Sequence, residues 1–241
     1  MIFTRETCRN LFLRGLPVEI LSALGPHLSR IELPRGEVLI RAGQRIETVI
    51  FPESGICSLV LTFTGNRQGE IGLFGREGLS DGALLAGVDH LPHDTIVQVP
   101  GTGLAMRPEK FIEQCALSPA LHHAVMRLAH IMSLQVAQTA VANATYNVEE
   151  RLARWLLMCQ DRLGGDEIDL THDFLGTMLS VRRSTVTLTI HILEGAGMIR
   201  ATRGRITIRD REALIGIADG SYGIAEREYE RLIGPLRNVA A

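Results

Sequence analysis

The pattern of hydrophobic and polar positions changes along the chain and divides it into regions of different predicted structure. From residue 30 to about 105, short runs of Val, Ile, Leu and Thr are separated by glycine every few residues. Short apolar runs with such frequent turn signals predict antiparallel strands in a barrel or sandwich. Before them, residues 17–28 have an amphipathic pattern with Pro17 in the first turn, which predicts a short helix.

After Pro108 the pattern takes a helical period, and a long helix is predicted because residues 109–147 contain no glycine and no proline beyond Pro119. Seven residues alternate spacings of four and three, as the a and d positions of a coiled coil do over about three heptads. They are Leu121, Val125, Leu128, Met132, Gln135, Thr139 and Ala142. This narrow seam with small residues around it predicts pairing with an identical helix, and packing within its own domain is the alternative.

A further helix is predicted over residues 147–165, which have acids at the start, arginines later and Gly164–Gly165 at the end. Trp155 shares an apolar face with Leu152, Leu156 and Cys159. The only tryptophan is therefore expected to anchor a core rather than to bind a ligand.

Two short helices joined by a tight turn are predicted between residues 170 and 195. Thr171 can cap the first helix, and Gly176 has no side chain to keep the second helix away. The two apolar faces comprise Phe174, Leu175, Met178 and Leu179 in the first helix and Val186, Ile190 and Leu193 in the second. This is a helix-turn-helix, which exposes a recognition helix at about 183–194 to the major groove of DNA.

Positive charge gathers in the same region. Arg182 and Arg183 stand at the start of the second helix, where the helix dipole disfavours a cation by about 0.3–1 kcal/mol. A DNA phosphate or a guanine would remove this conflict. After the second helix, residues 198–208 alternate apolar and polar positions about the turn Arg203–Gly204–Arg205, which predicts a two-stranded wing with a basic tip.

The charge of this region differs from that of the whole chain. From Arg182 to Arg209 there are six arginines and one acid, Glu194, although the whole chain has a net charge of −2. A phosphate-binding surface requires such a local concentration of positive charge.

The order of these regions resembles the Crp/Fnr superfamily of bacterial transcription regulators. The similarity covers nearly the whole chain, from the roll motif LPRGEVLIRAGQRIETVIFPESGICSLV through the long helix to the winged helix-turn-helix. It implies an α+β fold with an antiparallel, jelly-roll-like β-roll at 1–112, a dimerisation helix at 113–146 and a winged helix-turn-helix domain with a helical tail at 147–241. It also implies a homodimer whose sensory domain repositions two recognition helices on a palindromic operator in double-stranded DNA, with RNA polymerase as a further partner.

The expected DNA contacts are of two kinds. Arg183, Ser184, Thr187 and His191 are expected to reach base edges, and Arg182, Arg203 and Arg205 to contact phosphates, while Thr171 and Thr185 complete the expected set. The family's frequent Glu-x-x-Ser-Arg reading pattern is replaced by Ser184, Thr187 and Leu188. The target sequence should therefore differ from that of familiar members.

The roll departs from the cyclic-nucleotide-binding members of the family. Where they have a ribose-binding glutamate and an Arg-Ser or Arg-Thr pair for the phosphate, this chain has Ser80 and then His93 and Asp94. A carboxylate beside a phosphate in a partly desolvated pocket costs binding energy, so cyclic AMP is not expected to bind. Control by another small ligand or haem is one alternative, and a cyclic-nucleotide signalling module without DNA binding is another, which the arginine-rich wing disfavours.

Other chemistry and a membrane location are not expected. The four cysteines are spread singly, which argues against a metal or iron–sulfur site and for a reducing compartment. No paired catalytic carboxylates, G-x-S-x-G or P-loop indicate an enzyme. The charged N-terminus lacks a signal-peptide core, and the uncharged stretch 128–148 carries polar residues that lipid would leave unpaired, so a cytoplasmic location is expected.

Overall fold

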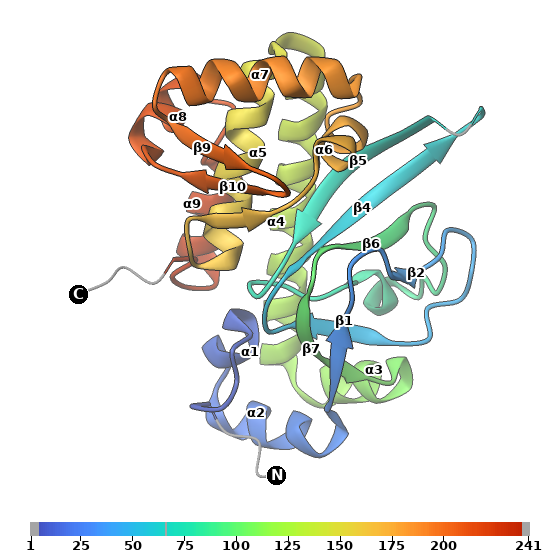
Figure 1. The fold of residues 1–241 in the computed structure, drawn as a ribbon. Helices are drawn as coiled ribbons and strands as arrows, with labels where there is room; N and C mark the ends of the chain where they lie inside the picture. The colour runs from blue at the N-terminus through green and yellow to red at the C-terminus, as the bar shows by residue number, and fades with distance from the viewer. Residues whose placement is uncertain (1–4, 66, 238–241) are drawn as a thin grey trace.

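The computed structural model describes residues 5–65 and 67–237, and its N-terminal half is a β-roll beside a long helix (Figure 1). The roll region contains α1 (Leu11–Gly15), α2 (Val18–Leu24), the 3-10 helix η1 (Gly25–His27), β1 (Ser29–Leu33), β2 (Val38–Ile40), β3 (Val49–Pro52), β4 (Ile56–Phe63), β5 (Arg67–Phe74), the 3-10 helix η2 (Ala83–Ala86), β6 (Asp94–Val99) and β7 (Gly101–Met106). Residues 1–4 and 238–241 of the first and last predicted domains lie outside the described residues.

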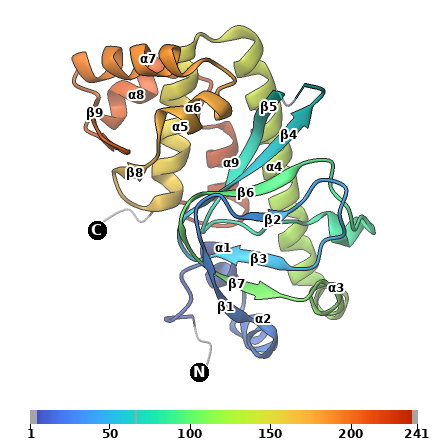
Figure 2. The same cartoon turned by 45° about the vertical axis from the view of Figure 1, so that its right-hand side comes forward.

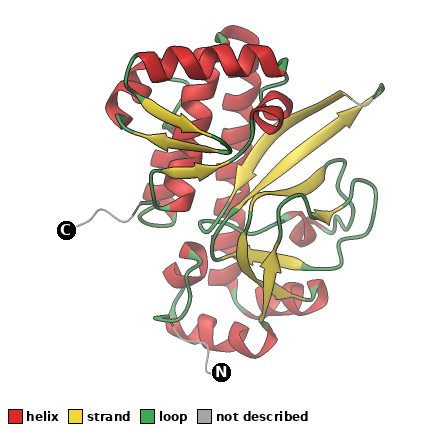
Figure 3. Ribbon diagram, in the orientation of Figure 1, coloured by secondary structure: helices red, strands yellow, loops and turns green. Residues whose placement is uncertain are grey.

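Two antiparallel sheets make up the roll, which confirms the predicted class of this region (Figure 3). One sheet has the strand order β1-β7-β3 and the other has β2-β6-β4-β5. In the second sheet, Val60 of β4 lies opposite Glu70 of β5, and Ser58 of β4 lies opposite Ile96 of β6. Strand β5 is therefore an edge strand, and its outer edge is free to meet another element.

The predicted long helix is interrupted near its start. Helix α3 spans Pro108–Leu117 and helix α4 spans Pro119–Thr145. Between them, Ser118 has an extended backbone (φ −126°, ψ 98°), and its side chain accepts a hydrogen bond from the Leu121 N–H at 3.2 Å. The residue before a proline is disfavoured in the α conformation, so the break falls directly before Pro119.

The predicted dimer seam of α4 lies against the roll of the same chain. Leu121, Val125 and Gln135 are at most 2% exposed. The Gln135 side chain accepts a hydrogen bond from the Leu73 N–H at 2.7 Å and donates one to the Leu73 carbonyl at 3.1 Å, on β5. Since these side chains have no surface left for a second subunit, their assignment as dimer contacts is corrected.

The remaining seam positions lie on the same side of α4. Ala142 is buried, and Leu128, Met132 and Thr139 are half-buried. Leu128 packs against the apolar cluster of the roll, and Met132 packs against the cluster around Phe74. The heptad spacing therefore reflects packing of α4 within its own subunit, which is the alternative to helix pairing given above.

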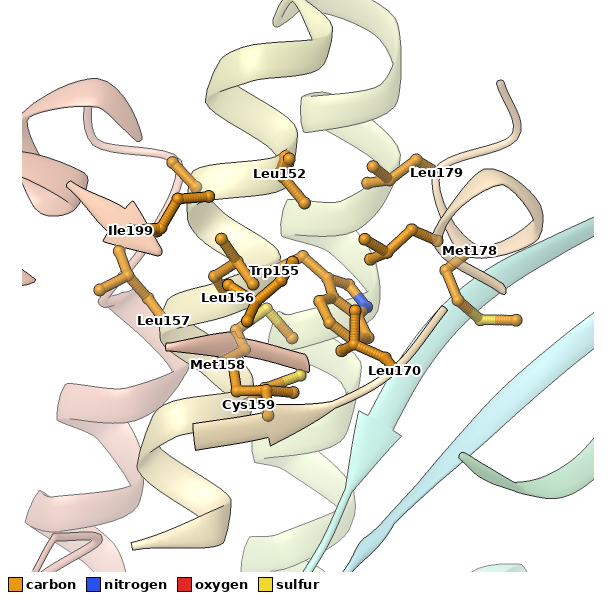
Figure 4. Close-up of a cluster of buried hydrophobic side chains, with 14 of the residues drawn as sticks. Leu152, Trp155, Leu156, Leu157, Met158, Cys159, Leu170, Met178, Leu179 and Ile199 are labelled. Atoms are coloured by element: carbon orange, nitrogen blue, oxygen red, sulfur yellow. The ribbon is translucent and has the colours of Figure 1, made fainter. Parts of the chain in front are cut away.

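The C-terminal half is built around helix α5 (Figures 2 and 4). It contains α5 (Val148–Leu163), β8 (Glu167–Asp169), α6 (His172–Met178), α7 (Arg183–Gly195), β9 (Ile199–Thr202), β10 (Arg205–Ile208), α8 (Arg211–Ile217) and α9 (Ile224–Leu232). Trp155 is 3% exposed within the core around α5, as predicted, and its indole N–H donates to Glu70 Oε1 of the roll at 2.9 Å. This contact joins the two halves of the molecule.

The C-terminal tail returns to the long helix. Helix α9 packs along α4, where Ala225 and Tyr229 share a buried cluster with Ile131 and Leu236. The Tyr229 hydroxyl donates to the Glu77 carbonyl at 3.0 Å, so the tail also contacts the roll. Among residues 5–65 and 67–237, no helix combines the length and apolar character that a membrane crossing requires.

Candidate nucleic-acid interface

Helices α6 and α7 form the predicted helix-turn-helix. The Thr171 hydroxyl caps α6 by accepting a hydrogen bond from the Phe174 N–H at 3.3 Å. A Cβ on Gly176 would lie 3.0 Å from the Val181 carbonyl oxygen, so glycine permits the close approach of the turn. Ser180 takes the left-handed conformation within that turn (φ 52°), which leads the chain into α7.

Helix α7 has one buried face and one solvent face. Val186, Ile190 and Leu193 are at most 1% exposed, which confirms the predicted inward positions. The opposite face carries Ser184, Leu188 and His191, all exposed. In Figure 1, α7 lies near the top edge of the molecule. This helix is therefore free to approach an extended partner.

The guanidinium of Arg183 forms an ion pair with a carboxylate of the same chain. Its guanidinium Nη1 lies 2.9 Å from Asp173 Oδ2, and both side chains are 66% exposed. The charge conflict at the start of α7 is thus relieved internally, so it does not by itself require an external anion. An exposed pair of this kind is worth about 0–1 kcal/mol, and a nucleic acid can displace it. Arg182, the N-cap residue, is exposed and has no ion pair with any described residue.

Thr185 and Thr187 are less accessible than the sequence analysis expected. Both are partly buried in the structure. The Thr187 hydroxyl donates to the Arg183 carbonyl at 3.1 Å and lies 3.0 Å from His172 Nδ1. The Thr187 hydroxyl, which we expected to reach a base edge, is therefore already hydrogen-bonded within the chain.

The predicted wing is present, and a third strand joins it. Strands β9 and β10 pair through the turn at Arg203–Gly204, and β8 adds to the other side of β10. Strand β8 brings Asp169 Oδ1 to 2.8 Å from the Arg205 Nε and Glu167 Oε2 to 3.0 Å from the Arg205 Nη1. Arg205 is therefore neutralised within the wing.

The two predicted wing arginines consequently differ. Arg203 is exposed at the tip, and no described acid forms an ion pair with it. The acids that pair with Arg183 and Arg205 all precede Arg182 in the sequence. The net positive charge counted above over residues 182–209 therefore does not include them. Short strand β8 was missed because three residues carry too little periodicity to be recognised.

The turn of the helix-turn-helix rests on the roll. The hairpin of β4 and β5 lies beside α6, and the Ser180 hydroxyl donates to the Gln68 carbonyl at 3.3 Å. A groove between them is lined by Phe63 and Arg67 of the hairpin and by Arg182 and Arg183 of the turn. No local sequence signal indicates this contact, since the residues are more than 100 positions apart.

A cavity of about 340 Å³ lies between the roll, α4 and the tail. Its apolar walls include Leu59, Phe74, Val125, Leu128, Met132, Tyr229 and Leu236. Ser80 and His93, two of the residues that we expect at the family's nucleotide-binding positions, are among its lining residues. Asp94 instead accepts a hydrogen bond from the Ala42 N–H at 2.8 Å, which corrects its expected position beside a ligand phosphate.

The charged side chains around this cavity are not suited to an anion. Arg162 is the arginine in its wall, and its Nε lies 2.8 Å from Glu77 Oε1, with both side chains almost fully buried. Asp81 and Glu226 add carboxyl groups to the lining, and burial raises the pKa of Asp81. Burial lowers the pKa of His93, which favours its neutral form. A phosphate would therefore meet carboxyl groups and an arginine that is already paired.

Comparison with known proteins places the helix-turn-helix in a family. A Crp-like helix-turn-helix domain model matches residues 150–217. No curated protein matches the chain. Solved structures are similar over most of its length, although the identities are low.

FixK2 from Bradyrhizobium japonicum is 12% identical, with a TM-score of 0.68 over 79% of this chain and 96% of that chain. TTHB099, a transcriptional regulator of the CRP family from Thermus thermophilus, is 17% identical, with a TM-score of 0.66 over 81% of this chain and 98% of that chain. The c-di-GMP responsive global regulator CLP from Xanthomonas campestris is 16% identical, with a TM-score of 0.63 over 80% of this chain and 99% of that chain.

These likenesses show a shared fold, with an N-terminal antiparallel roll, a long helix and a C-terminal helix-turn-helix. The family model adds a match in sequence over α5, the helix-turn-helix and the wing. Residues 150–217 thus match a Crp-like helix-turn-helix domain, and the chain shares its fold with solved transcriptional regulators such as the CRP-family protein TTHB099.

Proposed function

We propose that the chain is a transcription regulator of the Crp/Fnr superfamily. It acts as a homodimer that binds a palindromic operator in double-stranded DNA, with RNA polymerase as a further partner. The observation that carries this proposal is the exposed face of α7, together with exposed Arg182 at the N-cap of that helix and exposed Arg203 at the tip of the wing. A helix-turn-helix dimer sets its two recognition helices about 34 Å apart, in successive major grooves. Base edges are read by α7, and phosphates are bound by Arg182 and Arg203.

A second face of α4 supports dimerisation. Beside the face that packs on the roll, this helix exposes a stripe of small and apolar residues, Met126, Ala129, Ser133, Ala137, Ala140 and Ala144, of which Met126 and Ala129 also border the cavity. Met126 is 48% exposed, and the neighbouring Val141 is 56% exposed. Small side chains allow two helices to approach closely, so we place the subunit interface on this face rather than on the predicted seam.

Substitution of two arginines tests DNA binding. Arg183→Ala should lower the affinity for the operator by about 1–3 kcal/mol, with the loss concentrated at one base pair. Arg203→Ala should weaken binding to all sequences similarly and reduce the salt dependence, because it removes a phosphate contact. Fluorescence anisotropy on operator and scrambled duplexes at several salt concentrations separates the two effects. If neither variant differed from the unsubstituted protein, α7 and the wing would not be the DNA-binding surface.

The cavity supports control by a small ligand other than cyclic AMP. Its one arginine is paired with Glu77, and its remaining polar side chains are carboxyl groups, Ser80, His93, Gln135 and Tyr229. Isothermal calorimetry with cyclic AMP is therefore expected to show no binding to the full-length protein. A micromolar dissociation constant would contradict this, and would mean that Arg162 exchanges its carboxylate partner for the phosphate.

A further inference from the structure

The centre of the recognition helix carries an exposed leucine. Leu188 is 62% exposed, and Ile192, one turn later, is 42% exposed. At 100° per residue, Leu188 lies in the middle of the solvent face of α7, with Ser184 one turn before it and His191 one turn after it. Leu188 thus lies between polar side chains on one side and the apolar Ile192 on the other, on the face that we assign to DNA.

Packing within the chain does not explain this leucine. The core side of α7 is already supplied by Val186, Ile190 and Leu193. Helix α7 contacts α5, α6 and β9, all of which lie on its buried side. A single exposed apolar residue is common on protein surfaces, so its position rather than its exposure is informative here. Leu188 is placed where a base edge would lie if α7 entered the major groove.

The major groove offers one apolar group to such a side chain, the 5-methyl group of thymine. Leucine has no donor or acceptor, so it cannot read the other groups of the base edges. Arg183 stands on a different side of α7, toward Asp173, and does not compete for the same base. We propose that Leu188 selects thymine at one position of each operator half-site through contact with its methyl group, an inference that rests on the proposed DNA binding.

Removal of the methyl group tests the contact directly. An operator is first obtained by in vitro selection with the full-length protein, and each thymine is then replaced by uracil, one symmetric pair at a time. At one position, uracil should weaken binding by about three- to tenfold per half-site, because one buried methyl group contributes about that much. In Leu188→Ala, the same replacement should change the affinity by less than twofold.

Control variants separate this contact from general effects. Val18→Ala removes an apolar side chain that is 57% exposed on α2, far from the DNA-binding domain, and should keep the full dependence on the methyl group. Because Leu188 is exposed, Leu188→Ala should keep the thermal unfolding midpoint of the unsubstituted protein, which circular dichroism can verify.

Several results would overturn the inference. If uracil were tolerated at every position, or if Leu188→Ala kept the dependence, Leu188 would not read a methyl group. If Ile192→Ala abolished the dependence while Leu188→Ala did not, the contact would belong to Ile192. Failure of selection to enrich any sequence would overturn the proposed DNA binding as well, so the two failures are distinguishable.

Discussion

The Asp173 carboxylate lies 2.9 Å from the Arg183 guanidinium, on the surface that we propose binds DNA. The carboxylate competes with DNA for the arginine and also repels phosphates. Asp173→Asn should therefore raise the affinity for DNA by about two- to fivefold and make its salt dependence steeper. Anisotropy titrations at several salt concentrations measure both quantities.

Glu109→Gln is the matched control for this change. It removes one acidic charge from the exposed surface of α3, far from the helix-turn-helix, and should leave DNA binding nearly unchanged. Equal gains in the two variants would show that net charge, rather than release of Arg183, sets the affinity.

Glu70 is buried at the junction of the roll and the C-terminal half. It accepts hydrogen bonds from Gln98 Nε2 and Trp155 Nε1, both at 2.9 Å, and from the Ser58 hydroxyl. Burial raises the pKa of Glu70 to about 7, and these hydrogen bonds oppose the increase only in part. The native state therefore keeps this proton at pH values where the unfolded chain has lost it.

This retained proton predicts how stability depends on pH. The contribution of Glu70 to the free energy of unfolding is fully present below about pH 4.5. It is lost as the pH rises through about 7, because unfolding in that range releases a proton. Glu70→Gln should remove this decrease, which amounts to about 1–3 kcal/mol. Urea denaturation between pH 5 and 8 gives the free energy of unfolding of the unsubstituted protein and of Glu70→Gln. In the difference between the two proteins, the titration of all other groups cancels. Parallel pH profiles would show that Glu70 is ionised in the folded protein.

At the scale of single elements, helix α4 presents two different faces. One face is buried against the roll through residues such as Val125, and the face beside it exposes small residues such as Ala137. Ala137→Asp should place two like charges in the proposed subunit interface and shift the protein from dimer to monomer, at a cost of several kcal/mol. Sedimentation velocity gives the oligomeric state, and operator affinity should fall with it.

Ala116→Asp, on the exposed side of α3, introduces the same charge outside the proposed interface and should leave the oligomeric state unchanged. A dimer that persisted in Ala137→Asp would place the interface on another surface of the subunit.

The faces of α4 also show what periodicity can and cannot predict. The helical period of the sequence predicted α4, and the residues of its apolar face were identified correctly. Burial of apolar surface is not directional, so a stripe does not identify the surface that covers it. The hydrogen bonds between Gln135 and Leu73 connect residues that are 62 positions apart, and only the folded chain shows that the stripe faces the roll.

At the scale of the whole molecule, buried charges join the roll, α5 and the tail. Arg162 of α5 lies 2.8 Å from Glu77 of the roll and 3.9 Å from Glu226 of α9, and all three side chains are at most 10% exposed. Arg162→Met should destabilise the protein by about 3–5 kcal/mol, because it leaves buried carboxylates without a partner. Chemical denaturation measures this loss.

Two further variants define the cause of that loss. Arg205→Ala breaks an ion pair whose arginine is 47% exposed and should cost less than about 1 kcal/mol. Combining Arg162→Met with Glu77→Gln should recover part of the stability, since the two changes act on one pair. Additive losses in the double variant would mean that the two side chains stabilise the protein independently.

The sequence by itself determined the features that depend on residues close together in the chain. The strands of the roll, the helix-turn-helix with its Thr171 cap and close turn at Gly176, and the inward positions of α7 all follow from short-range periodicity and backbone sterics. The tertiary structure decided which surfaces meet: α4 against β5, Asp173 and Asp169 against the arginines, and the tail against the cavity. These contacts join distant residues, and charge or apolarity alone does not specify a partner, so only the complete fold selects among the surfaces that each residue could cover.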